Sequence, residues 1–133
     1  MRYLCLVYLD DAKLDALGPD AWDALMGETL ACDDDLRASG LCLASGALQP
    51  VEMALTVRVG SGGVTAVDGP SSDEWRQIGW FALLEARDLN EAIRVAARLP
   101  PARLGSVEVR PLAEPVPWAA AAWSPRIRHL VIE

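Results

Sequence analysis

Residue types that support several common enzyme chemistries are scarce in this sequence. It contains one histidine, His129, and one lysine, Lys13, which lies in an acidic, loop-like stretch where Schiff-base chemistry is not expected. The three cysteines, Cys5, Cys32 and Cys42, form no CxxC pair, so the sequence predicts neither a disulfide framework nor a zinc cluster. The scattered acids also lack the spacing of a metal site, so we expect no metal and no other cofactor.

Long hydrophobic runs and basic clusters are also missing. The apolar residues come in short runs broken by Asp, Gly or Pro, and none approaches the ~20 residues that cross a bilayer. The first residues lack a signal-peptide cleavage pattern, so a cytoplasmic location is expected. Nineteen acidic and twelve basic residues give a net charge of −7, which repels phosphate backbones and anionic membranes. We therefore expect neither nucleic acid nor a membrane as a partner.

The first part of the chain predicts a strand, a helix and a second strand. The 133 residues, 52% of them hydrophobic, are enough for one domain with a buried core. Residues 2–9 are apolar and β-rich, which predicts a mostly buried first strand. A helix is expected to begin near Asp20, as its N-cap, and to end at Ser39, with Gly40 as its C-terminal stop. A short strand over 41–48 follows.

The rest of the core predicts a hairpin and a second strand–helix–strand unit. Residues 53–59 alternate apolar and polar side chains, the period of a half-buried strand, and a glycine-rich turn leads to a returning strand at 64–67. A strand with two apolar faces is expected at 78–85. A capping-box pattern opens a short helix within 88–99, which two prolines end. A last strand is expected at 105–110.

This order of elements indicates the fold class. Two strand–helix–strand units around a hairpin are typical of an α+β, ferredoxin-like fold, with two helices on one face of a mainly antiparallel sheet. The other face of such a sheet needs a cover, so a homodimer is predicted. We place the domain at residues 1–112. Residues 113–133 form an extension that is expected to pack on its own or on the partner subunit, as a structural cover or as a lid over a ligand cavity.

Asp33 is the anomaly of the first predicted helix. On helical spacing, the apolar stripe of this helix consists of Trp22, Leu25, Met26, Leu30 and Leu36. Asp33 points near the middle of this stripe, and Thr29 sits beside it. A carboxylate aimed inward is costly unless it is hydrogen-bonded, paired or facing a wet cavity. Asp33 therefore either bonds a backbone amide at the domain edge or serves as a cavity-lining acid or base, unless a slipped helix phase turns it to solvent.

Several short segments resemble a known family. These segments are MRYLCL (1–6), LRASGL (36–41), LQP (48–50), TVR (56–58), VDGP (67–70), AIRVAARLP (92–100) and GSVEVRP (105–111). In this order and spacing they resemble the YCII-related family, in its DGPF-domain branch, over residues 1 to about 114. The resemblance implies a ferredoxin-like fold of the dimeric α/β-barrel type, sheets that pack together in a dimer, and a cleft beside the first helix and the loop after the hairpin. It also implies, for some members, a histidine–aspartate pair, as in an aromatic dehydrochlorinase, while others accompany sigma factors.

The sequence departs from the family pattern in two places. His129, the one histidine, lies in the extension, so a helix-borne histidine–aspartate pair cannot form. After the Asp-Gly-Pro motif, Ser71 replaces the signature's phenylalanine, and DEWR at 73–76 replaces its usual ETKE continuation. Either the ancestral activity is lost or the pocket serves another substrate.

Two functions are consistent with these residues. The first is a cofactor-independent small-molecule enzyme that carries out proton transfer, such as elimination, isomerisation or cyclisation, in an acid-lined apolar pocket. Asp33 and Asp68 are its candidate acid–base groups, although Asp68 in Asp-Gly-Pro commonly caps a turn. Arg58 is a candidate anion-binding group, or else a surface ion-pair partner. Further candidates to line a pocket for a small apolar or aromatic ligand are Tyr8, Met26, Thr29, Trp75 and Trp80. The second function is a non-catalytic dimeric ligand-binding or accessory protein that has lost the histidine–aspartate pair.

Overall fold

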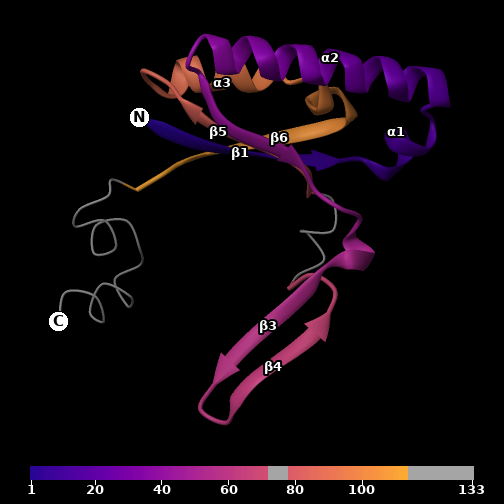
Figure 1. Cartoon of the computed structure of the whole chain (residues 1–133), viewed down its shortest axis with the longest axis vertical. Helices are drawn as coiled ribbons and strands as arrows, with labels where there is room; N and C mark the ends of the chain where they lie inside the picture. Colours follow the sequence, from indigo (N-terminus) through magenta and orange to yellow (C-terminus); the bar gives the residue numbers. More distant parts are fainter. Residues whose placement is uncertain (72–77, 114–133) are drawn as a thin grey trace.

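The structure is a computed structural model that describes residues 1–71 and 78–113 (Figure 1). The expectations for Trp75, and those for the extension beyond residue 113, lie outside these residues. Within the described ranges, no helix is long and apolar enough to cross a membrane.

A four-stranded antiparallel sheet forms the centre of the fold. Its strands are β1 (Arg2–Leu9), β2 (Cys42–Ala47), β5 (Ile78–Glu85) and β6 (Gly105–Pro111), in the spatial order β2-β5-β1-β6. Counted along the chain, these four strands stand in the order 2-3-1-4, which is the arrangement of a ferredoxin-like sheet. The predicted α+β, ferredoxin-like class is therefore confirmed.

Two helices cover one face of this sheet. Both α2 (Pro19–Ala38) and α3 (Leu89–Arg98) lie on the same side in Figure 1. Strand β1 alternates buried and half-buried residues, because every second side chain points to the helices. The core between the layers contains Tyr3, Cys5, Val7, Leu36, Cys42, Ala82, Leu84, Ala86, Ala92, Val95, Ala96 and Leu99.

The short elements include one that the sequence analysis missed. Helix α1 (Asp11–Asp15) occupies a stretch read only as polar, and the Asp10 side chain caps it by accepting from the amide of Ala12. At the predicted capping box before α3, Asp88 Oδ1 accepts from the Glu91 amide at 2.8 Å, as expected. After α3, the prolines form η3 (Pro100–Leu104), which leads into β6.

The predicted phase of α2 was wrong. The helix begins at Pro19 with Gly18 as its N-cap, and its inward face carries Leu25, Thr29, Cys32 and Leu36, with the spacing i, i+4, i+7 and i+11. Leu30, expected in the stripe, is 64% exposed, since it lies about 100° around the helix from Thr29. Asp33 consequently lies at the margin of the inward face and not at its middle.

The hairpin stands apart from the main sheet. After η1 (Val51–Met53), β3 (Leu55–Gly60) and β4 (Gly63–Asp68) pair only with each other and project away from the domain (Figure 1). The expected hairpin is confirmed, but the expected half-buried strand is wrong for a single chain. Val57 is 56% exposed and Val59 is 78% exposed, because no other described helix or strand packs on this two-stranded ribbon.

Candidate functional site

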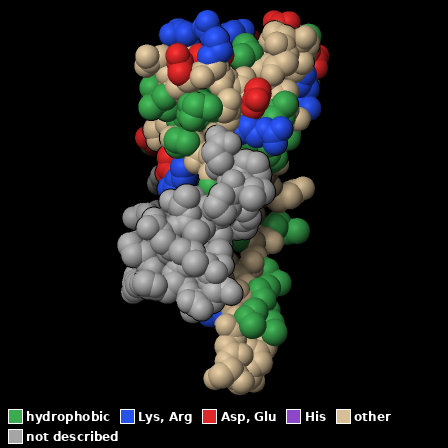
Figure 2. Space-filling view, turned by 90° about the vertical axis from the view of Figure 1, so that its left-hand side faces the viewer, with side chains coloured by type: hydrophobic (Ala, Val, Ile, Leu, Met, Phe, Trp, Pro, Cys, Tyr) green, Lys and Arg blue, Asp and Glu red, His purple; other side chains and the backbone are tan. Residues whose placement is uncertain are grey.

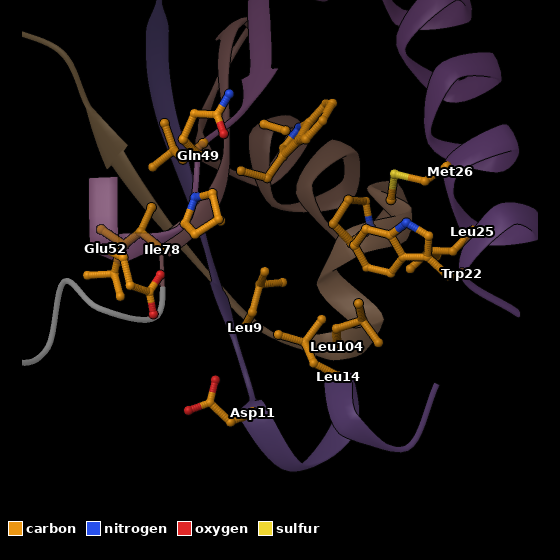
Figure 3. Close-up of a pocket in the computed structure, with 17 residues that line it drawn as sticks. Leu9, Asp11, Leu14, Trp22, Leu25, Met26, Gln49, Glu52, Ile78 and Leu104 are labelled. Atoms are coloured by element: carbon orange, nitrogen blue, oxygen red, sulfur yellow. The ribbon is translucent and has the colours of Figure 1, made fainter. Parts of the chain in front are cut away.

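A cavity of about 490 Å³ opens at the end of the main sheet where β1 and β2 end and β5 begins. In Figure 3, Trp22 and Met26 of α2 lie on one side, and Gln49 and Glu52 lie on the opposite side. The lining residues are mostly apolar: Leu9, Leu14, Trp22, Leu25, Met26, Ala47, Leu48, Pro50, Val51, Ile78, Gly79, Trp80, Pro101 and Leu104. A concave, mainly apolar space with a few polar groups is the usual form of a small-molecule site.

Local sequence explains how these walls arise. Strand β1 ends at Leu9 because Asp10 caps α1, and this cap turns Leu14 and Asp11 toward the space below α2. On the opposite side, β2 ends at Ala47, and Pro50 precedes η1, which carries Glu52. The cavity therefore lies beyond the ends of β1 and β2, between α1 and η1.

Among the described residues, three with polar side chains line the cavity: Asp11, Gln49 and Glu52. All three are exposed, and within residues 1–71 and 78–113 none of them makes a side-chain hydrogen bond or ion pair. Two carboxylates and one amide are thus available to a ligand. The sequence analysis missed all three residues. Asp10 is a typical N-cap residue, and this signal could have predicted α1 and hence the position of Asp11. Gln49 and Pro50 were interpreted only as the end of the second strand.

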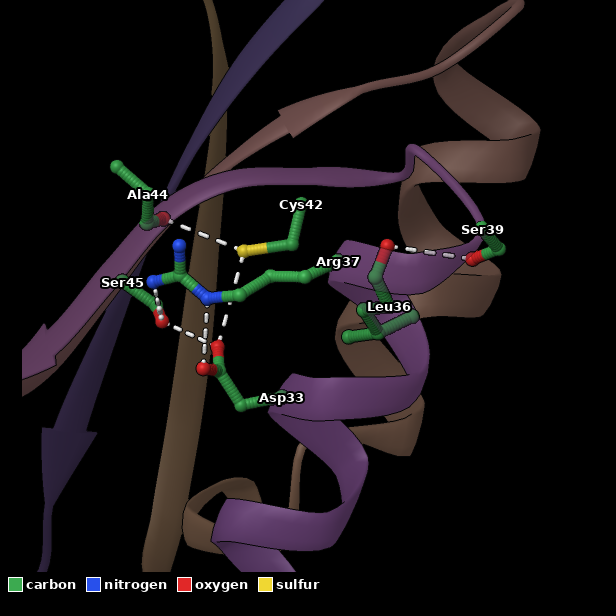
Figure 4. Close-up of polar contacts among 7 residues, drawn as sticks. All are labelled: Asp33, Leu36, Arg37, Ser39, Cys42, Ala44 and Ser45. Carbon is green, nitrogen blue, oxygen red and sulfur yellow. Dashed lines mark hydrogen bonds and ion pairs between the residues drawn. The ribbon is translucent and has the colours of Figure 1, made fainter.

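Asp33 belongs to a separate polar cluster between α2 and β2 (Figure 4). Its Oδ2 accepts a hydrogen bond from Arg37 Nε at 2.8 Å, and its Oδ1 accepts one from the Ser45 hydroxyl. Arg37 also donates to Ser45 Oγ at 3.0 Å. The thiol of Cys42 lies 3.8 Å from Asp33 Oδ1 and 3.3 Å from the Ala44 carbonyl oxygen. Each charged group of this cluster is matched by a partner.

The electrostatics of this cluster keep Asp33 ionised. Partial burial raises the pKa of the Asp33 carboxyl, but the hydrogen bonds from Ser45 and Arg37, together with the Arg37 charge, outweigh it. The pKa of Asp33 therefore lies below its ordinary value, and Arg37 has a raised pKa because of the same contact. A carboxylate held in this way is a weak base.

Asp33 does not line the large cavity. It lines a space of about 10 Å³ with Thr29 and other residues, and this volume is at most that of one water molecule. Trp80 and Pro101 line both spaces. Of the two roles considered for Asp33, the geometry therefore favours that of a structural hydrogen-bond acceptor over that of a cavity-lining acid or base. Its partners are the side chains of Arg37 and Ser45 and not the expected backbone amide.

The predicted ligand-lining residues are divided among several places. Met26 and Trp80 line the large cavity. Thr29 is buried, and its hydroxyl donates to the Leu25 carbonyl oxygen at 2.7 Å, so that it is bonded within its own helix. Tyr8 belongs to the alternate set of β1 residues that faces away from α2, and its hydroxyl donates to Glu108 Oε1 at 3.3 Å.

Arg58 and Asp68 lie on the hairpin, where both are exposed. Within one chain the structure does not bring them together with Asp33. The turn after β4 is closed by Thr56, whose hydroxyl donates to the Gly69 carbonyl oxygen at 2.6 Å, and by the Gly69 amide, which donates to Ala54 at 2.8 Å. Gly69 has a φ of 101°, a conformation that other residues rarely adopt.

The cysteines have little nucleophilic character. Burial raises the pKa of Cys5 to about 11, and burial also raises the pKa of Cys32 and Cys42. A thiol with a raised pKa contains little thiolate near neutral pH, so these residues act as core side chains.

Comparison with known proteins identifies the family. The model of the YCII-related domain matches residues 1–116. The chain belongs to the YCII-related domain family. An uncharacterised family relative from Rhizobium meliloti (strain 1021) is 30% identical over 115 residues, which cover 85% of this chain and 93% of that protein. The predicted family is thus confirmed.

One solved structure shares a low overall similarity with the chain. It is 5-chloro-2-hydroxyhydroquinone dehydrochlorinase from Burkholderia phenoliruptrix AC1100, in complex with 2,5-dihydroxybenzoquinone. The two chains are 17% identical, with a TM-score of 0.49, over 87% of this chain and 97% of the dehydrochlorinase. The fold assignment rests on the strand order described above and not on this similarity.

Proposed function

We propose that this protein binds a small apolar or aromatic molecule in the 490 Å³ cavity and acts on it by cofactor-independent proton transfer. The supporting observation is the combination of apolar walls with two carboxylates, Asp11 and Glu52, that are free of partners among the described residues. Apolar walls bind the ligand by the hydrophobic effect, and the few polar groups orient it.

The chemistry follows from what a bound ligand does to these carboxylates. A ligand that fills the cavity displaces water from the carboxylates, and loss of water makes a carboxylate a stronger base. Either carboxylate can then remove a proton from a carbon atom, while the Gln49 amide can donate a hydrogen bond to an oxygen that gains negative charge. Elimination, isomerisation and cyclisation all begin with such a step. In this proposal Asp33 supports the wall near Trp80 and does not transfer protons.

The alternative is a non-catalytic ligand-binding or accessory protein. It is favoured by the engagement of Asp33 with Arg37 and Ser45, and by the exposure of Asp11 and Glu52 to water. A binding protein needs the same apolar walls, so the cavity alone does not separate the two functions.

A generic proton-transfer probe separates them. The carboxylate base removes the C3 proton of 5-nitrobenzisoxazole, and the C–H electron pair completes a nitrile. The N–O bond breaks with its electron pair left on oxygen, which gives the coloured cyano-nitrophenolate. We expect the protein to accelerate this reaction and the combined variant Asp11→Asn/Glu52→Gln to lose about tenfold or more of the rate. The matched control is Asp34→Asn/Asp35→Asn, which removes two exposed carboxylates that do not line the cavity. Equal rates in the double variant and the control would contradict catalysis by the cavity carboxylates and leave the binding function.

We also propose that the protein is a homodimer whose interface is built from the face of the main sheet that points away from α2 and α3, and from the hairpin. Leu4, Leu6 and Phe81 face a groove of about 670 Å³ that the hairpin residues Leu55 and Val57 also line. An isolated two-stranded hairpin with exposed apolar side chains has little stability of its own in water. A second subunit would cover both surfaces at once.

A cytoplasmic location is part of this proposal. All three cysteines are free thiols, and two of them are buried. Free thiols persist in a reducing compartment.

A further inference from the structure

We infer that the cavity selects ligands whose polar end is cationic, such as a protonated amine, over ligands of the same shape whose polar end is a carboxylate. This inference rests on the proposed binding function and specifies the class of ligand for the same cavity. It follows from the charges that line the cavity, the engagement of nearby cations, and the aromatic side chains of the walls.

The charged groups that line the cavity are of one sign among residues 1–71 and 78–113. Asp11 of α1 and Glu52 of η1 contribute carboxylates that both lie toward the lower left of Figure 3, and Gln49 contributes a neutral amide. Among the described lining residues there is no lysine, arginine or histidine. A bound carboxylate would therefore lose water without gaining a cation, whereas an ammonium group would gain two anionic partners.

The arginine closest in sequence to the lining is already paired. Arg103 precedes the lining residue Leu104 in η3, and its guanidinium forms an ion pair with Glu28 of α2. Moving Arg103 to a bound anion would leave Glu28 without this partner. Arg37, on the other side of Trp80, is likewise held by Asp33 and Ser45. These contacts hold Arg103 and Arg37 away from the cavity. Lys13, next to the lining residue Leu14 in α1, does not line the cavity and makes no ion pair with the described residues.

Two tryptophans add a second attraction for cations. Trp22 and Trp80 both line the cavity, from α2 and β5 respectively. The face of an indole ring attracts an ammonium group, and tryptophan is the strongest aromatic partner for this interaction. The net charge of the chain, −7, acts in the same direction on an approaching ligand.

The exposure of Asp11 and Glu52 limits the size of the effect. Ion pairs that water reaches contribute modestly, and salt screens them. We expect the cationic ligand to bind about threefold to tenfold more tightly than its neutral analogue at low salt. The anionic analogue is expected to bind more weakly than the neutral one.

Three indole derivatives of similar shape provide the test: tryptamine is cationic, tryptophol is neutral and indole-3-acetate is anionic. Each is titrated into the ¹⁵N-labelled full chain, and the Kd is taken from amide and indole N–H shifts in NMR spectra. The expected order of affinity is tryptamine, tryptophol, indole-3-acetate. The variant Asp11→Asn/Glu52→Gln should bring the three Kd values together, and Asp34→Asn/Asp35→Asn should preserve the order.

The outcomes distinguish this inference from the proposed function. If none of the three compounds shifts the signals of cavity residues, the binding function itself fails. If tryptophol binds in the cavity but indole-3-acetate binds as tightly as tryptamine, the binding function stands and the selection of cations is overturned. Loss of the order in the Asp34→Asn/Asp35→Asn control would also overturn it, because the preference would then come from net charge and not from the cavity.

Discussion

Asp33 and Arg37, one turn apart on α2, are joined by a hydrogen bond of 2.8 Å, and both also bond Ser45 of β2. This contact ties the second half of α2 to the edge strand of the main sheet. The first half of the same helix carries Trp22 and Met26, which form one wall of the cavity. The polar cluster therefore helps to set the position of a wall that it does not itself line.

The Asp33 cluster makes stability depend on pH. We expect Asp33→Asn to lower the free energy of unfolding by about 1 kcal/mol at neutral pH, because a charged hydrogen-bond acceptor becomes a neutral one. The pKa of Asp33 is lower in the folded state than its ordinary value, so the unfolded state takes up the proton first as pH falls. The stabilisation is then fully present above the unfolded pKa of about 3.9 and is lost as pH falls through the folded pKa.

Urea denaturation at a series of pH values measures this dependence. The difference between the wild-type chain and Asp33→Asn should shrink as pH falls below about 4. Asp34→Asn, which changes an exposed neighbour on the same helix, serves as the control and should differ little from wild type. A constant difference down to strongly acidic pH would show that the Asp33 charge is not what stabilises the contact.

The cavity can be blocked by one substitution. We expect Met26→Trp to fill the space beside Trp22 and to weaken the binding of tryptophol about tenfold or more, with little loss of stability because position 26 is only half-buried. Leu30→Trp adds the same side chain to the same helix at an exposed position that does not line the cavity, so it should leave the Kd unchanged. The Kd values come from NMR titration and the stabilities from thermal unfolding. Unchanged binding in Met26→Trp would place the ligand elsewhere.

The proposed homodimer depends on the apolar face of the hairpin. Val57→Asp puts a carboxylate on the face of β3 that lines the groove beside the main sheet, and we expect it to yield monomers. Because Val57 is exposed in a single chain, the fold of each monomer should be preserved. Thr65→Asp adds the same charge to β4 opposite Arg58, and it should leave the dimer intact. Sedimentation equilibrium measures the mass, and a monomeric wild-type chain would contradict the proposal outright.

Much of the fold was predictable because its signals are local. The apolar, β-rich runs at β1 and β5, the capping box before α3 and the prolines after α3 each act within a few residues, and the structure confirms these elements. Their order along the chain then leaves few topologies for a sheet with two covering helices. The ferredoxin-like class therefore followed from the sequence alone.

The candidate site was decided by tertiary structure. The rotation of α2 about its axis depends on which side chains meet the sheet. The inward face is centred one residue away from the predicted stripe, so Asp33 lies at the margin of this face beside Ser45 and not at its middle. The cavity is assembled from residues 9–14, 22–26, 47–52, 78–80 and 101–104, which no local pattern connects. The sequence by itself determined which elements form and in what order, because caps and periodicity are short-range. Only packing between distant segments decided which side chains share a cavity, because that depends on how the elements are rotated and spaced.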